Sequence, residues 1–380
     1  MNKLHSLRRE LHSLAELSHH EARTAGRIGD WLKSTSPDDL IESLGGHGLA
    51  AVYQGPHTGP NILIRCDMDA LPIPETIDIP HLSLTPGVAH KCGHDGHMTI
   101  ACGLAQSLSQ QPPESGSVTL LFQPAEETGE GANLVLNDDK FEPLQPDWVF
   151  ALHNLPGFPQ KQIVVREGVF ASASIGWTAH LTGATSHAAE PQAGRCPTLA
   201  LSHLLSSLSS LPQCRVSLQE NSKVTVIYAR LGEQAFGTSP GEAIIMATIR
   251  AYMDDTMRRL TDRCNELALK TAAVFDLQCG VGTSQEFPAT VNHPDAARIV
   301  QLSAARAGLT TATPGYPFPW SEDFGCFTSR FKGAMFGIGA GETHPPLHHP
   351  DYEFPDELIE PGIEMFRQII RQLTQRKPSE

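Results

Sequence analysis

The segment from His90 to His97 concentrates side chains that bind metal ions. Its sequence, HKCGHDGH, brings together His90, Cys92, His94, Asp95 and His97. Thiolate, imidazole and carboxylate groups are the donors that bind zinc and its neighbours in the transition series. Gly93 and Gly96 allow the backbone to fold tightly enough to direct these side chains to one point. The segment therefore predicts a metal site.

Further candidate ligands follow the ends of predicted strands elsewhere in the chain. The apolar runs 61–66, 117–122 and 148–152 indicate buried strands, and the donors that follow them are Asp67 and Asp69, Glu126 and Glu127, and His153. A strand predicted at 334–338 is followed by His344, His348 and His349. Because sites in α/β proteins lie at the carboxyl ends of the strands, we expect these side chains to share one pocket.

The combined donors suit a pair of metal ions. The candidate ligands are Cys92, His94, Glu127, His153 and one of His344, His348 or His349. This is more than one tetrahedral zinc takes, whereas two ions a few ångströms apart can share a bridging ligand and a water. Such a pair lowers the pKa of the water toward neutrality and polarises a substrate carbonyl. The donor set therefore predicts hydrolytic chemistry.

Hydrolysis also needs a general base that is not itself a ligand. Glu126, next to Glu127, is the candidate, and Pro124 places both glutamates beyond the strand end. Ligating imidazoles usually bond a second group that fixes their orientation. The candidates for that role are Asp67, Asp69 and Asp95.

The order of predicted elements indicates an α/β protein with an inserted domain. Strands and helices alternate over residues 1–172 and 285–380, which predicts a catalytic domain with a mostly parallel sheet. Residues 173–284 follow the β-α-β-β-α-β order of a ferredoxin-like α+β domain, with elements at 176–182, 198–211, 224–231, 243–251, 256–275 and 276–281. Near the N-terminus, an S-x-x-E pattern at Ser18 and Glu21 predicts the start of a helix.

Composition excludes several classes of partner. The 380-residue chain carries a formal net charge of −14 and no basic run, which argues against nucleic acid and anionic membranes. The N-terminal residues lack the apolar core of a signal peptide, and no apolar stretch approaches the roughly 18 residues of a membrane span. The eight cysteines form no C-x-x-C pair. We therefore expect a cytoplasmic protein.

Five motifs together carry a family resemblance. In chain order, RCDMDALPIPE, HKCGHDGH, FQPAEETGEGA, ALHN and LHHPDYEFPDE resemble the M20 metallopeptidase family, in particular its aminoacylase, hippurate-hydrolase and auxin-conjugate-hydrolase branch. The resemblance implies that Glu126 is the general base and that Cys92 stands where related branches have a bridging aspartate. The ligands it implies are Cys92, His94, Glu127, His153 and His348.

The resemblance also assigns roles to the inserted domain. It implies dimerisation through this domain, and in GATSHAAEP it implies that His187 helps to bind the substrate carbonyl, often in the partner subunit's site. Arg250, in ATIR, is a candidate for binding a substrate carboxylate or for a structural ion pair. Two motifs depart from the family: GRCP at 194–197 replaces Gly-x-Asp-Pro, and GTSP at 237–240 replaces Asn-x-x-Pro. These departures bear on substrate identity and leave the metal chemistry intact.

The expected function is that of a dinuclear metal-dependent amidohydrolase that acts on N-acyl amino acids or similar small N-acyl amines. Donors of this kind accept zinc, manganese, nickel or cobalt. One alternative is dipeptidase- or carboxypeptidase-type cleavage of a short peptide. The other is a non-catalytic family member that is kept for binding. The cysteine-containing motif favours the acyl-amino-acid branch, and the complete set of ligands and base argues against a non-catalytic protein.

Overall fold

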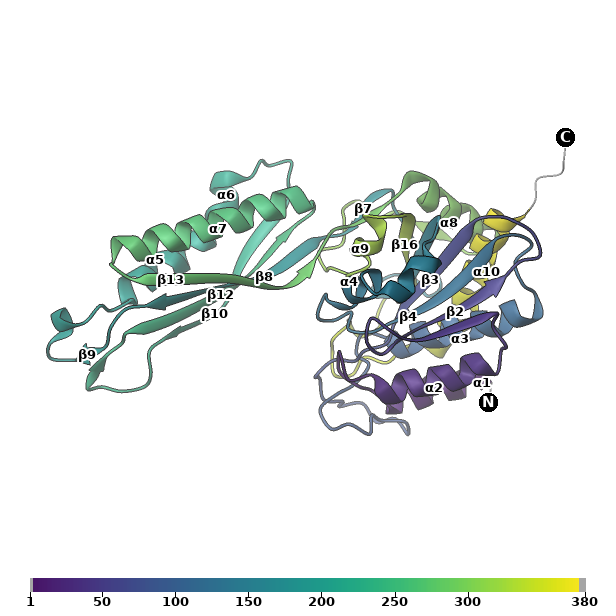
Figure 1. The fold of residues 1–380 in the computed structure, drawn as a ribbon, viewed down its shortest axis with the longest axis horizontal. Coiled ribbons are helices and arrows are strands. Elements are labelled where there is room, and N and C mark those ends of the chain that lie inside the picture. Colours follow the sequence, from purple (N-terminus) through teal and green to yellow (C-terminus); the bar gives the residue numbers. More distant parts are fainter. Residues whose placement is uncertain (1–2, 376–380) are drawn as a thin grey trace. The chain divides into compact units, whose positions relative to one another are not determined.

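The computed structural model describes residues 3–375, so the outermost ends of the predicted catalytic domain, residues 1–2 and 376–380, lie outside the described residues. The chain divides into two compact units (Figure 1). Unit 1 comprises Met1–Phe170, Thr290–Tyr316 and Asp323–Glu380, and unit 2 comprises Ala171–Ala289 and Pro317–Glu322. The predicted boundaries place Pro317–Glu322 in the catalytic domain, whereas the structure groups this segment with unit 2.

Unit 1 is built on an eight-stranded mixed sheet. In spatial order its strands are β1 (Asp39–Leu44), β2 (Gly48–Gln54), β4 (Ser117–Gln123), β3 (Asn61–Asp67), β5 (Trp148–Pro156), β16 (Lys332–Gly341), β6 (Ile163–Val164) and β15 (Thr311–Ala312). The central strands β4, β3, β5 and β16 run parallel, as the sequence predicts. The β1–β2 and β2–β4 pairs are antiparallel, and β1 and β2 are additions to the predicted sheet.

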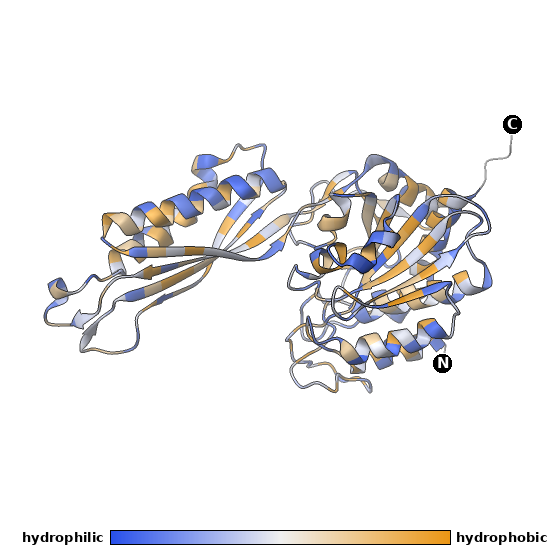
Figure 2. Ribbon diagram, viewed as in Figure 1, coloured by the Kyte–Doolittle hydropathy of each residue, from blue (hydrophilic) through white to orange (hydrophobic). Residues whose placement is uncertain are grey.

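The helices of unit 1 cover this sheet and close its core. They are α1 (Lys3–Ser13), α2 (Ala22–Lys33), α3 (His94–Gln110), α4 (Gly131–Leu136), α8 (Pro294–Arg306), α9 (Gly325–Thr328) and α10 (Ile359–Thr374), with 3-10 turns η1 (Asp139–Leu144) and η3 (Asp356–Leu358). The strands are mainly hydrophobic along their length (Figure 2), as expected where helices cover a parallel sheet. Helix α3 contacts α1, α2 and α10.

The predicted start of α2 is wrong. The helix begins at Ala22, and Glu21 at its N-cap position makes no side-chain capping bond. Instead, Ser18 Oγ donates a hydrogen bond to Asp69 Oδ2 at 2.6 Å, and Ala125 N donates one to Glu21 Oε1 at 2.8 Å. Both side chains of the S-x-x-E pattern therefore hold segments close to the predicted ligands, which a local capping pattern cannot reveal.

Unit 2 has the β-α-β-β-α-β order of a ferredoxin-like fold. Its main elements are β8 (Ala173–Thr182), α5 (Thr198–Leu208), α6 (Leu211–Arg215), β10 (Ser222–Leu231), β12 (Glu242–Ala251), α7 (Asp254–Val274) and β13 (Gln278–Phe287). The antiparallel sheet has the order β10-β12-β8-β13, with α5 and α7 on one face (Figure 1). The remaining short elements of the chain are β7 (Gly168–Ala171), β9 (Ser186–His187), η2 (Pro191–Ala193), β11 (Thr238–Ser239) and β14 (Thr290–Asn292).

Among residues 3–375, no helix combines the length and the apolar character that crossing a membrane requires.

Candidate metal centre

The predicted ligands of unit 1 gather at the carboxyl ends of its parallel strands. Strand β3 ends at Asp67, β4 ends at Gln123 just before the two glutamates, and β5 carries His153. Cys92 lies in the loop before α3, and His94 is the first residue of that helix. The convergence that the sequence predicts is therefore present in unit 1.

Two glycines of the HKCGHDGH segment are required by close packing. Gly93 has a φ of 94°, and a Cβ at this position would lie 2.5 Å from the side-chain oxygen of Asn154. A Cβ on Gly96 would lie 2.3 Å from the ring of Phe354. Any larger residue would push the loop away from β5 or from the C-terminal segment, so these glycines place Cys92 and His94 against the strand ends.

Two sets of three donors share the sulfur of Cys92. One set is Cys92, His94 and His153, and the other is Cys92, Glu127 and His348; within each set the ligand atoms all lie within 4.8 Å of one another. The Cys92 Sγ lies 3.5 Å from His153 Nε2. Glu127 Oε1 lies 3.7 Å from His94 Nε2 and 3.9 Å from His348 Nε2. Two adjacent sites with one common ligand are the arrangement that a dinuclear centre requires.

Two of the donor atoms are buried without a hydrogen-bond partner among the described residues, which fits a site for metal ions. His94 Nε2 and Glu127 Oε1 are inaccessible to solvent and have no hydrogen-bond partner among the described residues. Burial, together with the nearby charges of Asp69 and Asp67, raises the pKa of the Glu127 carboxyl to about 7 against the lowering effect of His94 and Cys92. Leaving such groups unpaired is costly, and a bound cation would satisfy both of them.

Backbone carbonyls orient the two buried ligand histidines. His94 Nδ1 donates to the carbonyl of Asp69 at 2.9 Å, and His153 Nδ1 donates to the carbonyl of Asn154 at 2.8 Å. These bonds leave Nε2 of each ring for the metal. Burial lowers the pKa of His94, but Asp67, Asp69 and Glu127 outweigh this effect and raise it to about 10.

Asp69 holds the two glutamates. Strand β4 ends at Gln123, and Ala125 then adopts a φ of 51°, which turns the chain sharply. Beyond this turn the backbone N–H groups of Glu126 and Glu127 donate to the carboxylate of Asp69, at 3.1 and 3.0 Å. Both carboxylates and His94 have ligand atoms within 4.8 Å of one another, so Glu126 lies beside the ligands without belonging to either Cys92 set.

Of the three histidines in the C-terminal loop, His348 is the one that belongs to a donor set, together with Cys92 and Glu127. Its backbone has a φ of 64°, a strained conformation for this residue, and its N–H donates to the carbonyl of Lys91 at 2.8 Å. The neighbouring histidines are engaged elsewhere: His344 Nε2 donates to the Glu353 carbonyl, and His349 Nδ1 accepts from Asp351 N. The His348 side chain is about half exposed, whereas His94 and His153 are buried.

The contacts of Asp95 differ from the predicted ones. Its carboxylate accepts hydrogen bonds from His12 Nδ1 at 2.7 Å, from Arg8 Nη1 at 3.3 Å and from the N–H of Gly96. It therefore binds α1 to the first turn of α3 and makes no hydrogen bond with a ligand imidazole. The side chain of Asp95 points away from the ligands although it follows His94 directly, because successive residues on a helix face different directions.

The two predicted substrate residues lie in unit 2. His187 is exposed on β9, where its Nδ1 accepts a hydrogen bond from Ala189 N. Arg250 Nη1 donates to the carbonyl of Pro319 at 3.1 Å and to Ser321 Oγ at 3.0 Å. These acceptors are neutral, so these contacts do not form the structural ion pair that was the alternative role for Arg250.

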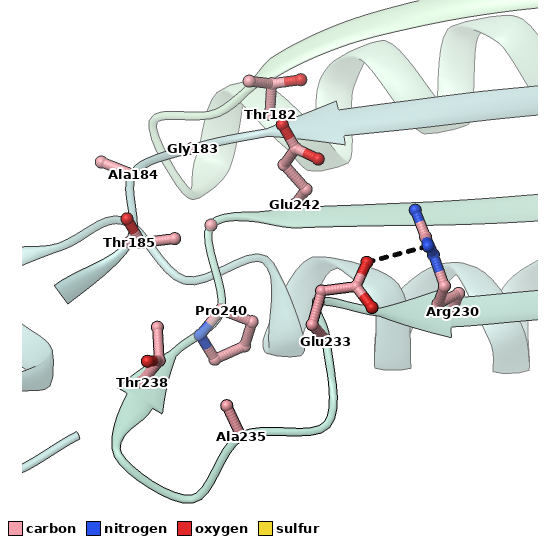
Figure 3. A pocket seen from close by; sticks show the side chains of 12 residues that line it. Thr182, Gly183, Ala184, Thr185, Arg230, Glu233, Ala235, Thr238, Pro240 and Glu242 are labelled. Atoms are coloured by element: carbon pink, nitrogen blue, oxygen red, sulfur yellow. Dashed lines mark hydrogen bonds and ion pairs between the residues drawn. The ribbon is translucent and has the colours of Figure 1, made fainter. Parts of the chain in front are cut away.

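The altered GTSP motif borders a pocket at one end of unit 2 (Figure 3). Thr238 and Pro240 of the motif line it with Thr185, and Arg230 and Glu233 form an ion pair across part of the wall. β11, which includes Thr238, pairs with β9, which carries His187. No residue of the two donor sets lines this pocket, so it is distinct from the metal centre.

Sequence reasoning missed a buried ion pair beneath the ligands. Arg65 Nη1 donates to Asp67 at 2.6 Å, and Arg65 Nη2 donates to Asp323 at 2.7 Å. The one available signal was an arginine inside the apolar run ILIRCD, since a charge in a buried strand requires a partner. Asp323 also accepts hydrogen bonds from Gln123 Nε2 and from the N–H of Ala132.

Comparison with known proteins gives a consistent result. The model of the peptidase family M20/M25/M40 matches residues 63–372. The chain is 28% identical to an N-acetylcysteine deacetylase of Bacillus subtilis, covering 97% of this chain and 96% of that protein. It is 29% identical to a hippurate hydrolase of Campylobacter jejuni, covering 93% and 92%.

Solved structures agree in fold over nearly the whole chain. The YXEP protein of Bacillus subtilis, described as a dinuclear metal binding peptidase from the M20 family, superimposes with a TM-score of 0.83 at 25% identity, covering 98% of this chain and 97% of that one. A putative aminohydrolase from Staphylococcus aureus gives a TM-score of 0.88 at 24% identity, covering 98% and 96%. With the shared-sulfur donor sets and the adjacent glutamate, these matches show that the chain belongs to the peptidase family M20/M25/M40 and is a metal-dependent amidohydrolase.

Proposed function

We propose that this amidohydrolase removes the acyl group from N-acyl amino acids at a centre of two divalent ions. The observation that carries the proposal is the sharing of Cys92 by two three-donor sets, with the Glu126 carboxylate beside them. When bound, the two ions lower the pKa of a water molecule and polarise the substrate carbonyl. The residues would hold them as Cys92, His94 and His153 on one side and Cys92, Glu127 and His348 on the other.

Glu126 is the general base in this proposal. It accepts a proton from the attacking water and delivers it to the leaving nitrogen, which completes the cleavage of the amide bond. Its position is supported by the bond from its own N–H to Asp69 and by the N–H of Asp323, which lies 3.4 Å from Glu126 Oε1. Because Asp69 also holds Glu127, base and ligand are fixed relative to each other.

The substrate class is inferred from the relatives and from unit 2. The two named relatives act, by their names, on N-acetylcysteine and on hippurate, and both compounds are N-acyl amino acids. Arg250 is the candidate for binding the free carboxylate, and His187 for a hydrogen bond to the substrate carbonyl. The altered motif at 237–240 borders the pocket of unit 2, and we propose that it adjusts substrate choice.

We propose further that the chain acts as a homodimer through unit 2. Strand β10 is an edge strand of the four-stranded sheet, and it exposes Ile227, Tyr228 and Leu231. A long edge strand with exposed apolar side chains is a surface that other chains cover. The exposed position of His187 on β9 is consistent with a role toward a partner subunit.

The test is a panel of substrates offered to enzyme reconstituted separately with zinc, manganese, nickel and cobalt. N-acetyl, N-benzoyl and indole-acetyl amino acids should be hydrolysed faster than unmodified dipeptides. Faster cleavage of dipeptides would favour the peptidase alternative. Failure to hydrolyse any amide with two ions bound would remove the proposal.

A further inference from the structure

Asp67 and His97 form a buried pair that the proposed mechanism does not use. Both side chains are buried, and His97 Nδ1 donates to Asp67 Oδ1 at 2.7 Å. Asp67 is the last residue of β3, and His97 lies in the first turn of α3. The pair therefore joins the two elements that border the donor set Cys92, His94 and His153.

The geometry makes Asp67 and His97 unsuitable as ligands, although their donor atoms lie close enough to His94 to hold an ion. Both ring nitrogens of His97 are already engaged, Nδ1 with Asp67 and Nε2 with the side-chain oxygen of Asn154 at 2.5 Å. The second oxygen of Asp67 accepts from Arg65. By contrast, Nε2 of His94 has no hydrogen-bond partner in the described part of the chain.

His97 instead supports the ligand His153. The rings of His97 and His153 pack edge to face with centroids 4.7 Å apart. His97 Nε2 is also within 3.3 Å of the backbone nitrogen of Asn154, and the carbonyl of Asn154 accepts the Nδ1 proton of His153. His97 thus fixes the residue whose carbonyl directs His153 Nε2 toward the site.

The same pair lies next to the other imidazole of that set. The His94 and His97 rings lie 5.5 Å apart, inclined by 30°, and Asp67 Oδ1 is 3.8 Å from His94 Nδ1. Within residues 3–375, neither Asp67 nor His97 makes a hydrogen bond or a ring contact with Glu127 or His348. Asp67 acts on Glu127 only through its charge, which helps to raise the pKa of that carboxyl. The support is therefore directed to one donor set.

We propose that Asp67 and His97 are positioning residues that determine how tightly the Cys92–His94–His153 set holds its ion, while the Cys92–Glu127–His348 set does not depend on them. The inference rests on the dinuclear centre of the proposed function. It concerns metal binding and no substrate, so its test does not depend on which amide is cleaved.

The chain offers a matched control in a second buried His–Asp pair. His12 Nδ1 donates to Asp95 Oδ2, also at 2.7 Å, and both side chains are buried. This pair makes no contact with a ligand side chain among the described residues. His12→Asn and His97→Asn therefore each remove a buried His–Asp pair, and only the second removes support from a ligand.

The experiment titrates metal-free protein with Co²⁺, following the visible absorption of the bound ion and the metal content after dialysis. Wild-type protein and the His12→Asn variant should bind two ions tightly. His97→Asn should keep one tight ion and bind the other about 10–100-fold more weakly, the usual effect of losing an outer partner of a ligand. Asp67→Asn, which keeps the shape of the side chain, should show the same selective loss and serves if His97→Asn fails to fold.

Combination with His348→Ala identifies the affected set. His348→Ala alone should weaken the other ion, so the double variant His97→Asn/His348→Ala should retain no tight ion. The inference is overturned if His97→Asn and Asp67→Asn bind both ions as the wild type does, or if His12→Asn loses the same ion equally. It is also overturned if the double variant still holds one ion tightly. A wild-type protein that binds two ions but hydrolyses no acyl amino acid would refute the proposed function alone.

Discussion

The guanidinium of Arg65 and the carboxylate of Asp323 form a fully buried ion pair, with Nη2 and Oδ1 2.7 Å apart. Arg65 lies on β3, two residues before Asp67, and the backbone N–H of Asp323 faces the Glu126 carboxylate. The buried guanidinium of Arg65 therefore links β3, which lies beneath the histidine ligands, to the segment beside the proposed base. Gln123 bonds both partners and completes the link.

Removal of Asp323 should destabilise unit 1 strongly. Asp323→Ala leaves Arg65 buried with one carboxylate in place of two, and breaking a buried pair in this way typically costs about 3–5 kcal/mol. The change is measured as the free energy of unfolding in urea. Asp255→Ala, which removes an ion pair with Arg258 on the surface of α7, is the control and should cost far less. Equal losses for the two variants would contradict the importance of the buried pair.

Replacement of Glu126 by glutamine should abolish turnover while metal binding persists. A positioned general base contributes about 10²–10⁴-fold to the rate, and glutamine keeps the size of the side chain but cannot accept the proton. The measurement is kcat together with metal content per chain. Glu130→Gln, at an exposed position that bonds His19, should leave both unchanged. Near-normal turnover in Glu126→Gln would remove the proposed mechanism.

His348→Ala and His349→Ala should differ sharply although the residues are neighbours. His348 reaches to within 3.9 Å of Glu127, whereas His349 bonds the backbone of Asp351. Loss of a direct ligand should weaken one ion by more than the roughly 10–100-fold cost of losing an outer partner. Metal titration of both variants checks this. Comparable weakening by His349→Ala would show that the loop as a whole, and not His348, holds the ion.

Stability should fall between about pH 6.5 and pH 9 because of His12. Burial lowers the pKa of His12, but its bonds to Asp95 and Glu75 outweigh this and raise the pKa to about 9. Since the folded pKa exceeds the unfolded value of 6.5, the contribution is complete below pH 6.5 and is lost as the pH rises through 9. The loss is on the order of 3 kcal/mol. Urea unfolding across this range should show the slope in the wild type, and His12→Asn should lack that part of it.

Ile227→Lys should shift the proposed homodimer toward monomer. The change places a charge on the exposed edge strand β10, where it would have to be buried in a partner contact. Light scattering coupled to gel filtration measures the mass, and Leu199→Lys, at an exposed position on helix α5, is the comparison. A dimer that survives Ile227→Lys but dissociates with Leu199→Lys would place the interface on the helical face.

The sequence was most informative where a metal-binding side chain directly follows a predicted strand. Glu127 and His153 could be predicted to share one pocket because parallel strands bring their ends to one edge of the sheet, and in the structure each of them lies close to Cys92 and His94. Asp323 could not be predicted as the partner of Arg65, because nothing local relates residues so far apart in the chain. The direction of the Asp95 side chain could not be predicted either, because it depends on hydrogen bonds with His12 and Arg8 of another helix.

The shared sulfur has a consequence for handling the protein. Each donor set has three protein atoms, and Cys92 Sγ is the atom common to both. Oxygenation of that sulfur would leave each set with two unmodified donors in a single event, so we expect it to weaken the binding of both ions at once. A reductant that does not itself bind metal is therefore needed in any buffer in which the ions are counted.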